Sequence, residues 1–266
     1  MSQAHYLENV LKVFDMQDCK PRSTPCELNM NSYLESNAPI QDSRKYRQMV
    51  GSLIYVMTCT RPDLAFAVTK LSQHLSSPES SEWATLKDAF QYVKKTVAHK
   101  LNFVKQREEI RLVAYCDADW ATSVDRRSVS GYVVSLSSSG PLISWKSKKQ
   151  ASVALSTCEA EYVALSIACQ ELIYLSRLIS ELLPSKLPTA ILMNDNQGAL
   201  ALIKNPVKHS KAKHIDIRYH FTRECYQNNQ VVIDYVPSSE NVADIFTKPP
   251  KRNLLVRFEQ FLFGHV

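Results

Sequence analysis

Four acidic residues, each in its own local context, could do chemistry in this 266-residue chain. Asp117 and Asp195 each end an apolar run that is typical of a buried strand. Glu161 lies early in a long apolar helix, and Asp244 follows the segment 235–243. Carboxylates at the ends of buried strands are costly unless a cation meets them. The order Asp, Glu, Asp, Asp on strand, helix, strand and helix therefore predicts a cation-binding site.

The residue types in this set indicate which cation and which reaction. Carboxylate oxygens are the hard ligands that Mg²⁺ prefers in proteins. Two such ions, roughly 3.5 to 4 Å apart, activate water and stabilise the leaving oxygen in phosphodiester hydrolysis. Four carboxylates can carry that charge and leave room for a scissile phosphate. The sequence thus predicts a two-metal nuclease site.

Two of the positions leave a choice between neighbouring acids. Asp119 follows Asp117 on the same side if the strand continues, and one of the two could only cap a loop. In the helix, Ser156 and Glu159 have capping-box spacing, so Glu159 is predicted to hold the helix start. Glu161 is in line with the apolar stripe at 165, 168, 172, 175 and 179 and is predicted to face the core. The alternative is a glutamate at the edge of the stripe that reaches solvent.

Asp195 and Asp244 are each ambiguous when taken alone. Asp195 precedes Asn196, Gln197 and an apolar helix, so it could be an N-cap. Asp244 on a short helix could be an ordinary surface acid. The four acids together are far more specific than any one of them.

Clusters of basic and aromatic residues flank these acids and favour contact with nucleic acid. His209, His214 and His220 suggest zinc, but their strongly basic surroundings oppose a cation and favour phosphate contact or packing. The predicted nucleic-acid-binding residues are Arg126, Arg127, Trp145, Lys146, Lys148, Lys149, Asn196, Gln197, Lys211, Lys213, His214 and Arg218.

The composition excludes several classes of protein. The net charge of +6 and the pI of about 8.9 favour an anionic partner. Seven scattered cysteines without a C-x-x-C pair indicate a reduced, intracellular protein with no structural zinc site. No signal-peptide core is present, and the apolar stretch 50–59 is too short to span a bilayer, so no membrane contact is expected. The five glycines cannot build a P-loop or a Rossmann turn.

The pattern of apolar and polar residues changes near residue 109. Before it, the pattern predicts short helices over 6–14, 46–59, 64–75 and 80–99. After it, the pattern predicts strands over 110–116, 129–137, 142–146, 190–194 and 231–236. Helices are predicted over 157–183, 196–203 and 215–228, with a last one from 239. This order predicts a mixed α/β sheet with helices on its faces.

Seven motifs carry a resemblance to a known family. They are YCDADWA (115–121), SGYV (130–133), SWK (144–146), LSTCEAEYVAL (155–165), NDN (194–196), KHIDIRYHF (213–221) and ADIFTK (243–248). Over about 110–250 they closely resemble the ribonuclease H domain of copia-type LTR retrotransposon Pol polyproteins. The stretches YRQMVGSLIYVM (46–57) and TRPDLAFAV (60–68) resemble the segment that joins the polymerase to that domain.

The resemblance implies a ribonuclease H-like mixed five-stranded sheet with helices on both faces, preceded by a mainly helical connection segment. It implies a thumb- or connection-like fragment over 1–108, the ribonuclease H-like domain over 109–250 and a C-terminal helical tail over 251–266. It also implies that Asp117, rather than Asp119, joins Glu161, Asp195 and Asp244 as the catalytic, metal-binding acids.

The resemblance further implies an activity and its setting. Two Mg²⁺ ions, which Mn²⁺ can replace, would support cleavage of the RNA strand of RNA–DNA hybrids. The upstream polymerase of the same polyprotein is the expected protein partner. The expected location is intracellular, in cytoplasmic virus-like particles or in the nucleus.

Two departures from the pattern leave alternatives open. Cellular ribonucleases H carry a His in the loop before the last acid, whereas 237–241 has none, so turnover is expected to be slow. The polymerase motif Tyr-x-Asp-Asp is absent, so no DNA synthesis is expected. A non-catalytic nucleic-acid-binding remnant is the main alternative, and a transposase-like reading is disfavoured because such enzymes use the order Asp, Asp, Glu.

Overall fold

The computed structural model describes residues 1–27, 38–105, 109–121, 125–184, 187–204 and 213–264. The chain divides into two compact units, one of residues 1–104 with 249–266 and one of residues 105–248. The boundary near 104 lies close to the one expected at 108. Residues 251–266, expected as a separate tail, belong to the first unit in this division, together with residues 249–250, which were expected to end the second domain.

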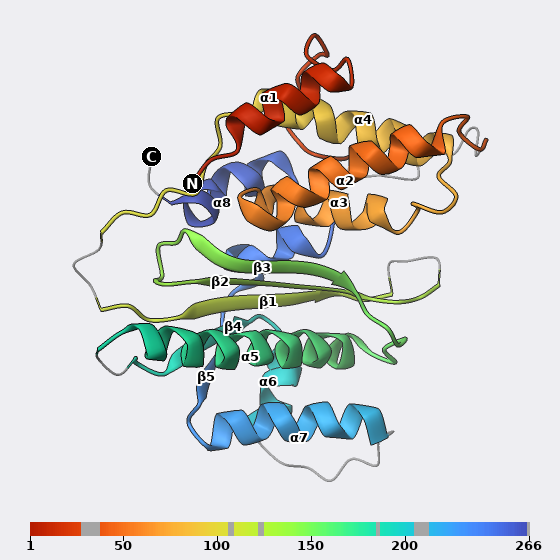
Figure 1. Ribbon diagram of the computed structural model, residues 1–266. Coiled ribbons are helices and arrows are strands. Elements are labelled where there is room, and N and C mark those ends of the chain that lie inside the picture. Colours follow the sequence, from red (N-terminus) through yellow and green to blue (C-terminus); the bar gives the residue numbers. More distant parts are fainter. Residues whose placement is uncertain (28–37, 106–108, 122–124, 185–186, 205–212, 265–266) are drawn as a thin grey trace. The chain divides into compact units, whose positions relative to one another are not determined.

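The first unit is mainly helical, as the sequence predicts (Figure 1). A single helix was expected over 64–75, but a 3-10 turn precedes a shorter α-helix there, because Pro62 begins the turn at its first position. Its elements are α1 (Ala4–Val13), α2 (Ser43–Cys59), η2 (Pro62–Leu64), α3 (Ala65–Ser72), α4 (Ser80–Lys95) and α8 (Arg252–Phe263).

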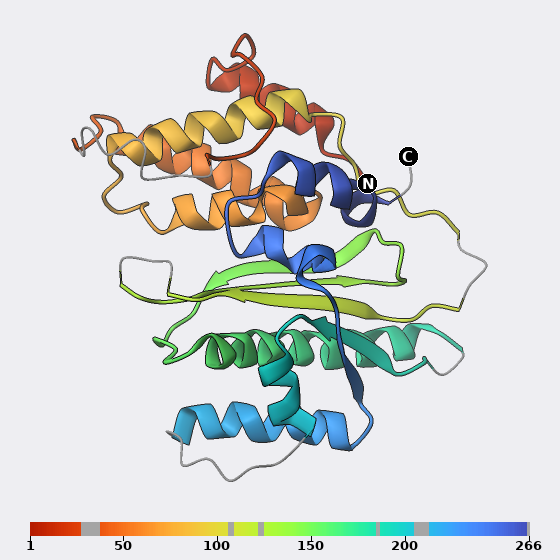
Figure 2. The same ribbon diagram turned by 180° about the vertical axis from the view of Figure 1, so that it is seen from behind.

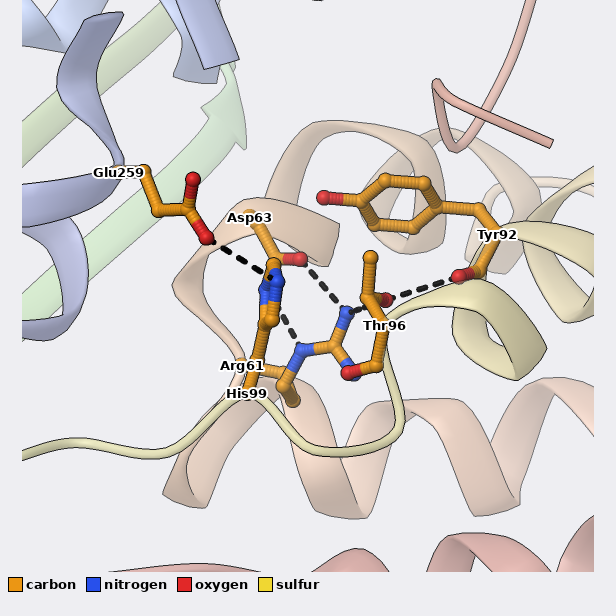
Figure 3. A network of polar contacts seen from close by, with 6 residues as sticks. All are labelled: Arg61, Asp63, Tyr92, Thr96, His99 and Glu259. Carbon is orange, nitrogen blue, oxygen red and sulfur yellow. Dashed lines mark hydrogen bonds and ion pairs between the residues drawn. The ribbon is translucent and has the colours of Figure 1, made fainter. Parts of the chain in front are cut away.

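Polar contacts around the buried Arg61 and the nearby His99 join several of these elements (Figure 3). Arg61, which is fully buried, donates to both carboxylate oxygens of Asp63 at 2.9 and 2.7 Å. Arg61 also donates to the Thr96 carbonyl oxygen at 3.1 Å. On α8, Glu259 pairs with His99 at 3.2 Å. The C-terminal helix is therefore tied to residues near the end of α4, far away in the sequence.

The second unit contains the predicted mixed five-stranded sheet. The strands are β1 (Val113–Asp119), β2 (Val129–Ser135), β3 (Leu142–Lys149), β4 (Ala190–Asn194) and β5 (Val231–Tyr235), in the order β3-β2-β1-β4-β5. The pairs β1–β2 and β2–β3 are antiparallel, and β1–β4 and β4–β5 are parallel.

Strand β1 extends further than its apolar pattern indicates. It was expected to end at 116, but it pairs with β2 until Asp119 lies opposite Val129. The backbone ladder, rather than the apolar run, sets the end of the strand. Asp117 therefore lies inside β1, opposite Gly131.

Helices cover both faces of this sheet. The long helix α5 (Thr157–Leu182) contacts β1 and β2, and α6 (Gln197–Lys204) and α7 (Lys213–Gln227) lie on the same side (Figure 1, Figure 2). Tyr132 packs in the core on the α5 side, whereas its neighbour Gly131 lies against Phe246. Because neighbouring strand residues face opposite ways, the segment around Phe246 covers the other face.

The segment that covers this other face differs from the last helix that the sequence predicts. Two short 3-10 turns, η3 (Ser238–Glu240) and η4 (Val242–Phe246), replace it. Asn241 separates them and caps η4, since its side chain accepts from the Ala243 amide at 3.1 Å. The backbone of Asn241 is extended, with φ −74° and ψ 101°, and this conformation interrupts a continuous helix.

The core of the second unit lies between the sheet and α5. Ala114 and Cys116 of β1, with Leu112 just before the strand, lie in this core together, as the alternation predicts. Within the described residues, α5 is the one helix long and apolar enough to cross a membrane by length and composition. Here it packs on β1 and β2, which is the position of a core helix.

Candidate metal centre

Three of the four predicted acids meet at one place. Asp117, Glu161 and Asp195 each offer an oxygen, and these oxygens lie within 4.8 Å of one another. Asp117 comes from β1, and Asp195 directly follows β4, its parallel neighbour. Asp117 and Glu161 are 7% and 6% exposed, and Asp195 is partly buried. Asp119 is not part of this group.

The start of α5 aims Glu161 at the sheet. The Ser156 hydroxyl accepts from the Glu159 amide at 3.2 Å, as a helix cap does. The Glu159 carboxylate accepts from the Leu155 amide at 3.0 Å, one residue before the cap that was expected to donate. Glu159 thus holds the helix start, and Glu161, two residues later, faces the acids.

Two buried asparagines, to which sequence reasoning gave no role, hold the centre together. Asn194 donates from Nδ2 to Glu161 Oε2 at 2.9 Å and to the Cys116 carbonyl oxygen at 3.1 Å. Asn241 donates to the same carbonyl oxygen at 3.0 Å. A polar residue next to an acid at the end of an apolar strand was the available signal for Asn194.

Asp195 does not cap α6. Asn196 does so, because its side-chain oxygen accepts from the Ala199 amide at 2.9 Å. Asn196 was predicted to contact nucleic acid, and its side-chain oxygen has this structural role. The Asp195 carboxylate is therefore available to the acid group.

Asp244 lies apart from the three clustered acids. Its carboxylate forms an ion pair with Lys248, four residues later. It is still close enough for its charge to raise the pKa of Asp117. Sequence reasoning did not single out Lys248.

A glycine lets the Asp244 segment approach the sheet. A Cβ atom on Gly131 would lie 2.8 Å from Phe246 Cβ and 2.9 Å from Thr247 Cγ2. A Cβ atom at these distances would clash, so η4 can pack this closely only against a glycine. The Thr247 hydroxyl then donates to Asp117 Oδ2.

The electrostatics of the acids favour the binding of a cation. Burial raises the pKa of Asp117 to about 6, and the Asp195 and Asp244 charges add to this rise. Burial, followed by the Asp117 charge, raises the pKa of Glu161 to about 9. Hydrogen bonds from Thr247 and Asn194 oppose these shifts without cancelling them. A divalent cation would favour the ionised forms, so this oxygen donor set fits Mg²⁺ or Mn²⁺.

Comparison with known proteins identifies the family. No protein-family profile matches the chain. It is 38% identical over 262 residues, 95% of its length, to the retrovirus-related Pol polyprotein from transposon TNT 1-94 of Nicotiana tabacum. It is 37% identical over 262 residues, 98% of its length, to that from transposon RE2 of Arabidopsis thaliana. The chain belongs to the copia-type retrotransposon Pol polyprotein family.

The match covers only part of these relatives. The chain spans 19% of the tobacco polyprotein and 18% of the Arabidopsis one. Among solved structures, the chain is similar to LC11-RNase H1 in complex with RNA/DNA hybrid, with 15% identity and a TM-score of 0.40. That likeness covers 52% of this chain and 94% of the other.

The predicted nucleic-acid-binding residues of this Pol segment occupy varied positions. Lys146 and Lys148 are exposed on the edge strand β3, whereas Trp145, the residue before Lys146, is partly buried. Lys149 and Arg127 both pair with Asp125, at 2.9 and 3.5 Å.

The remaining predicted contacts are less fully defined. Arg126 and Gln197 are exposed, and Arg218 is partly buried. Lys211 and His209 lie outside the described residues, as do the side chains of Lys213 and His214. Of the three histidines weighed as zinc ligands, only His220 has a described side chain, and it is exposed.

Proposed function

We propose that residues 105–248 form a ribonuclease H that cleaves the RNA strand of RNA–DNA hybrids during retrotransposon reverse transcription. The observation that carries this proposal is the meeting of Asp117, Glu161 and Asp195 within 4.8 Å. They meet on a mixed sheet with helices on both faces, in a chain of the Pol polyprotein family.

Two divalent cations are the proposed cofactors, held by Asp117, Glu161, Asp195 and Asp244. When bound, they would activate a water molecule and neutralise charge on the scissile phosphate. The protein's own contribution is to hold the carboxylates in place. Asn194 fixes Glu161 and Thr247 fixes Asp117, so little side-chain freedom remains to be lost.

The proposed substrate is recognised through its backbone. The net charge of +6 favours a polyanion, and Lys146 and Lys148 offer exposed ammonium groups on β3. Phosphate contacts of this kind release counterions, so affinity for the hybrid should fall with salt. Replacing both lysines with alanine should reduce the slope of log affinity against log salt by up to about two.

The rest of the polyprotein is the proposed partner. The chain spans about a fifth of its Pol relatives, so the polymerase part would act beside it. In this proposal the helical first unit is the connection-like segment between the two activities. The proposed place of action is intracellular, in virus-like particles or in the nucleus, and seven free cysteines are compatible with it.

A cleavage assay tests the proposal. Labelled RNA–DNA hybrid, duplex RNA and duplex DNA are incubated with the full chain, with Mg²⁺, with Mn²⁺ or with chelator. Only the hybrid should be cut, only in its RNA strand and only with a divalent cation. Asp195→Asn should abolish cutting and keep the fold, whereas Asp234→Asn, on an exposed residue of β5, should cut normally.

The same assay addresses the alternative of a non-catalytic remnant. If the wild-type chain binds the hybrid with a steep salt dependence and never cuts it, the chain is a binding protein. Cutting that persists in chelator, or in Asp195→Asn, would contradict the proposed chemistry.

A further inference from the structure

Lys248 lies at the acid group and is not explained by the proposed chemistry. Its ammonium pairs with the Asp244 carboxylate, and its charge interacts with Asp117 and Asp119 as well. The Asp244 side chain is 15% exposed and the Lys248 side chain is 48% exposed. The lysine therefore reaches from solvent into the side of the centre where the fourth acid lies.

The backbone that carries this pair is held firmly. Gly131 lets η4 pack directly on β2, and the Thr247 hydroxyl bonds both Asp117 and, at 3.1 Å, the Asp244 carbonyl oxygen. A long, half-exposed lysine can still swing into solvent without moving that backbone. The lysine head is thus the movable part of an otherwise fixed arrangement.

The carboxylates of the acid group are crowded, because oxygens of Asp117, Glu161 and Asp195 lie within 4.8 Å of one another and the Asp244 charge also acts on Asp117. Lys248 brings an ammonium to this group, since it pairs with Asp244 and its charge also reaches Asp117. An ammonium and a divalent cation would satisfy the same carboxylates, so the two compete for them.

We infer that Lys248 is an internal counter-ion that occupies the Asp244 side of the centre and must leave when a divalent cation binds there. The inference rests on the proposed function, since it assigns the affinity of that same metal site. Lys248 makes the metal-free protein more stable and makes the site bind metal more weakly. Half-exposed ion pairs are modest in strength, so we expect a three- to tenfold effect on the dissociation constant.

Metal binding can be measured without any nucleic acid. Free Mn²⁺ is quantified by electron paramagnetic resonance as it is titrated into the metal-free full chain. Lys248→Met should bind Mn²⁺ three- to tenfold more tightly than wild type. Lys204→Met removes the same charge from an exposed position at the end of α6 and should stay within twofold of wild type. Lys248→Arg keeps the charge and should not bind more tightly.

Thermal melts of the same variants give a second readout. In chelator Lys248→Met should melt below wild type, and its rise in melting temperature on adding Mn²⁺ should be larger. Unchanged or weaker Mn²⁺ binding by Lys248→Met would overturn the inference and leave the proposed nuclease intact. If neither wild type nor any variant binds Mn²⁺, the proposed metal centre itself fails.

Discussion

Replacing Glu161 with glutamine should separate the chemistry of the centre from its stability. Glu161 is 6% exposed, and burial together with the Asp117 charge raises its pKa from 4.5 to about 9. A glutamine of nearly the same shape can still accept the hydrogen bond from Asn194 Nδ2. It cannot ionise, so it removes both a metal ligand and a source of buried charge.

The size of the expected stability gain follows from the difference in Glu161 protonation between the folded and unfolded states. At pH 7 the unfolded chain has released the Glu161 proton, while the metal-free folded protein holds it. Because the folded pKa is the higher one, the free energy of unfolding falls as pH rises from 4.5 towards 9. The span from 4.5 to pH 7, at about 1.4 kcal/mol per pH unit, corresponds to about 3 kcal/mol. Glu161→Gln removes this cost and should raise the metal-free melting temperature by about 6 to 12 °C.

The assay is a set of thermal melts in chelator between pH 5 and pH 9, run beside hybrid cleavage in Mg²⁺. The gain in stability should grow with pH, and cleavage should fall by several orders of magnitude. Glu181→Gln, on an exposed residue of the same helix, is the matched control and should change neither. A Glu161→Gln variant whose stability follows the wild-type pH dependence would refute the assignment of a buried, raised-pKa carboxyl.

Three further changes test other parts of the fold. Glu159→Ala should lower the free energy of unfolding, measured by urea denaturation, by on the order of 0.5 to 2 kcal/mol, because the Leu155 amide loses its acceptor. Glu159→Gln should keep most of that stability, and both variants should keep cleavage. Gly131→Ala should cost about 1 to 3 kcal/mol and most of the activity, because its Cβ would meet η4; normal cleavage by that variant would show that η4 can shift freely. Arg61→Met should cost about 3 to 5 kcal/mol, because it leaves Asp63 buried without its partner, and adding Asp63→Leu should recover much of that loss; equal stability of the single and double variants would contradict this account.

The sequence by itself determined the class of the second unit and three of its acids. Alternation of apolar residues and the long apolar helix are local properties, so strands, α5 and their order could be predicted from the chain alone. The capping pattern separated Glu159 from Glu161, because a helix fixes the directions of residues two apart. The motifs then selected Asp117 over Asp119, and the structure brings Asp117 into the group.

The tertiary structure decided what depends on partners distant in sequence. Asn194 reaches the carbonyl oxygen of Cys116 across the β1–β4 pair, and no local pattern marks that contact. The Asp244 segment forms 3-10 turns that pack on Gly131. Its Asp244 carboxylate pairs with Lys248 and does not join the other three acids. Residues 249–266 joined the first unit through contacts such as Glu259 with His99. Such features depend on packing and charge interactions between segments that only the folded chain brings together. These interactions produce no periodic pattern in the sequence, so they could not be predicted from it.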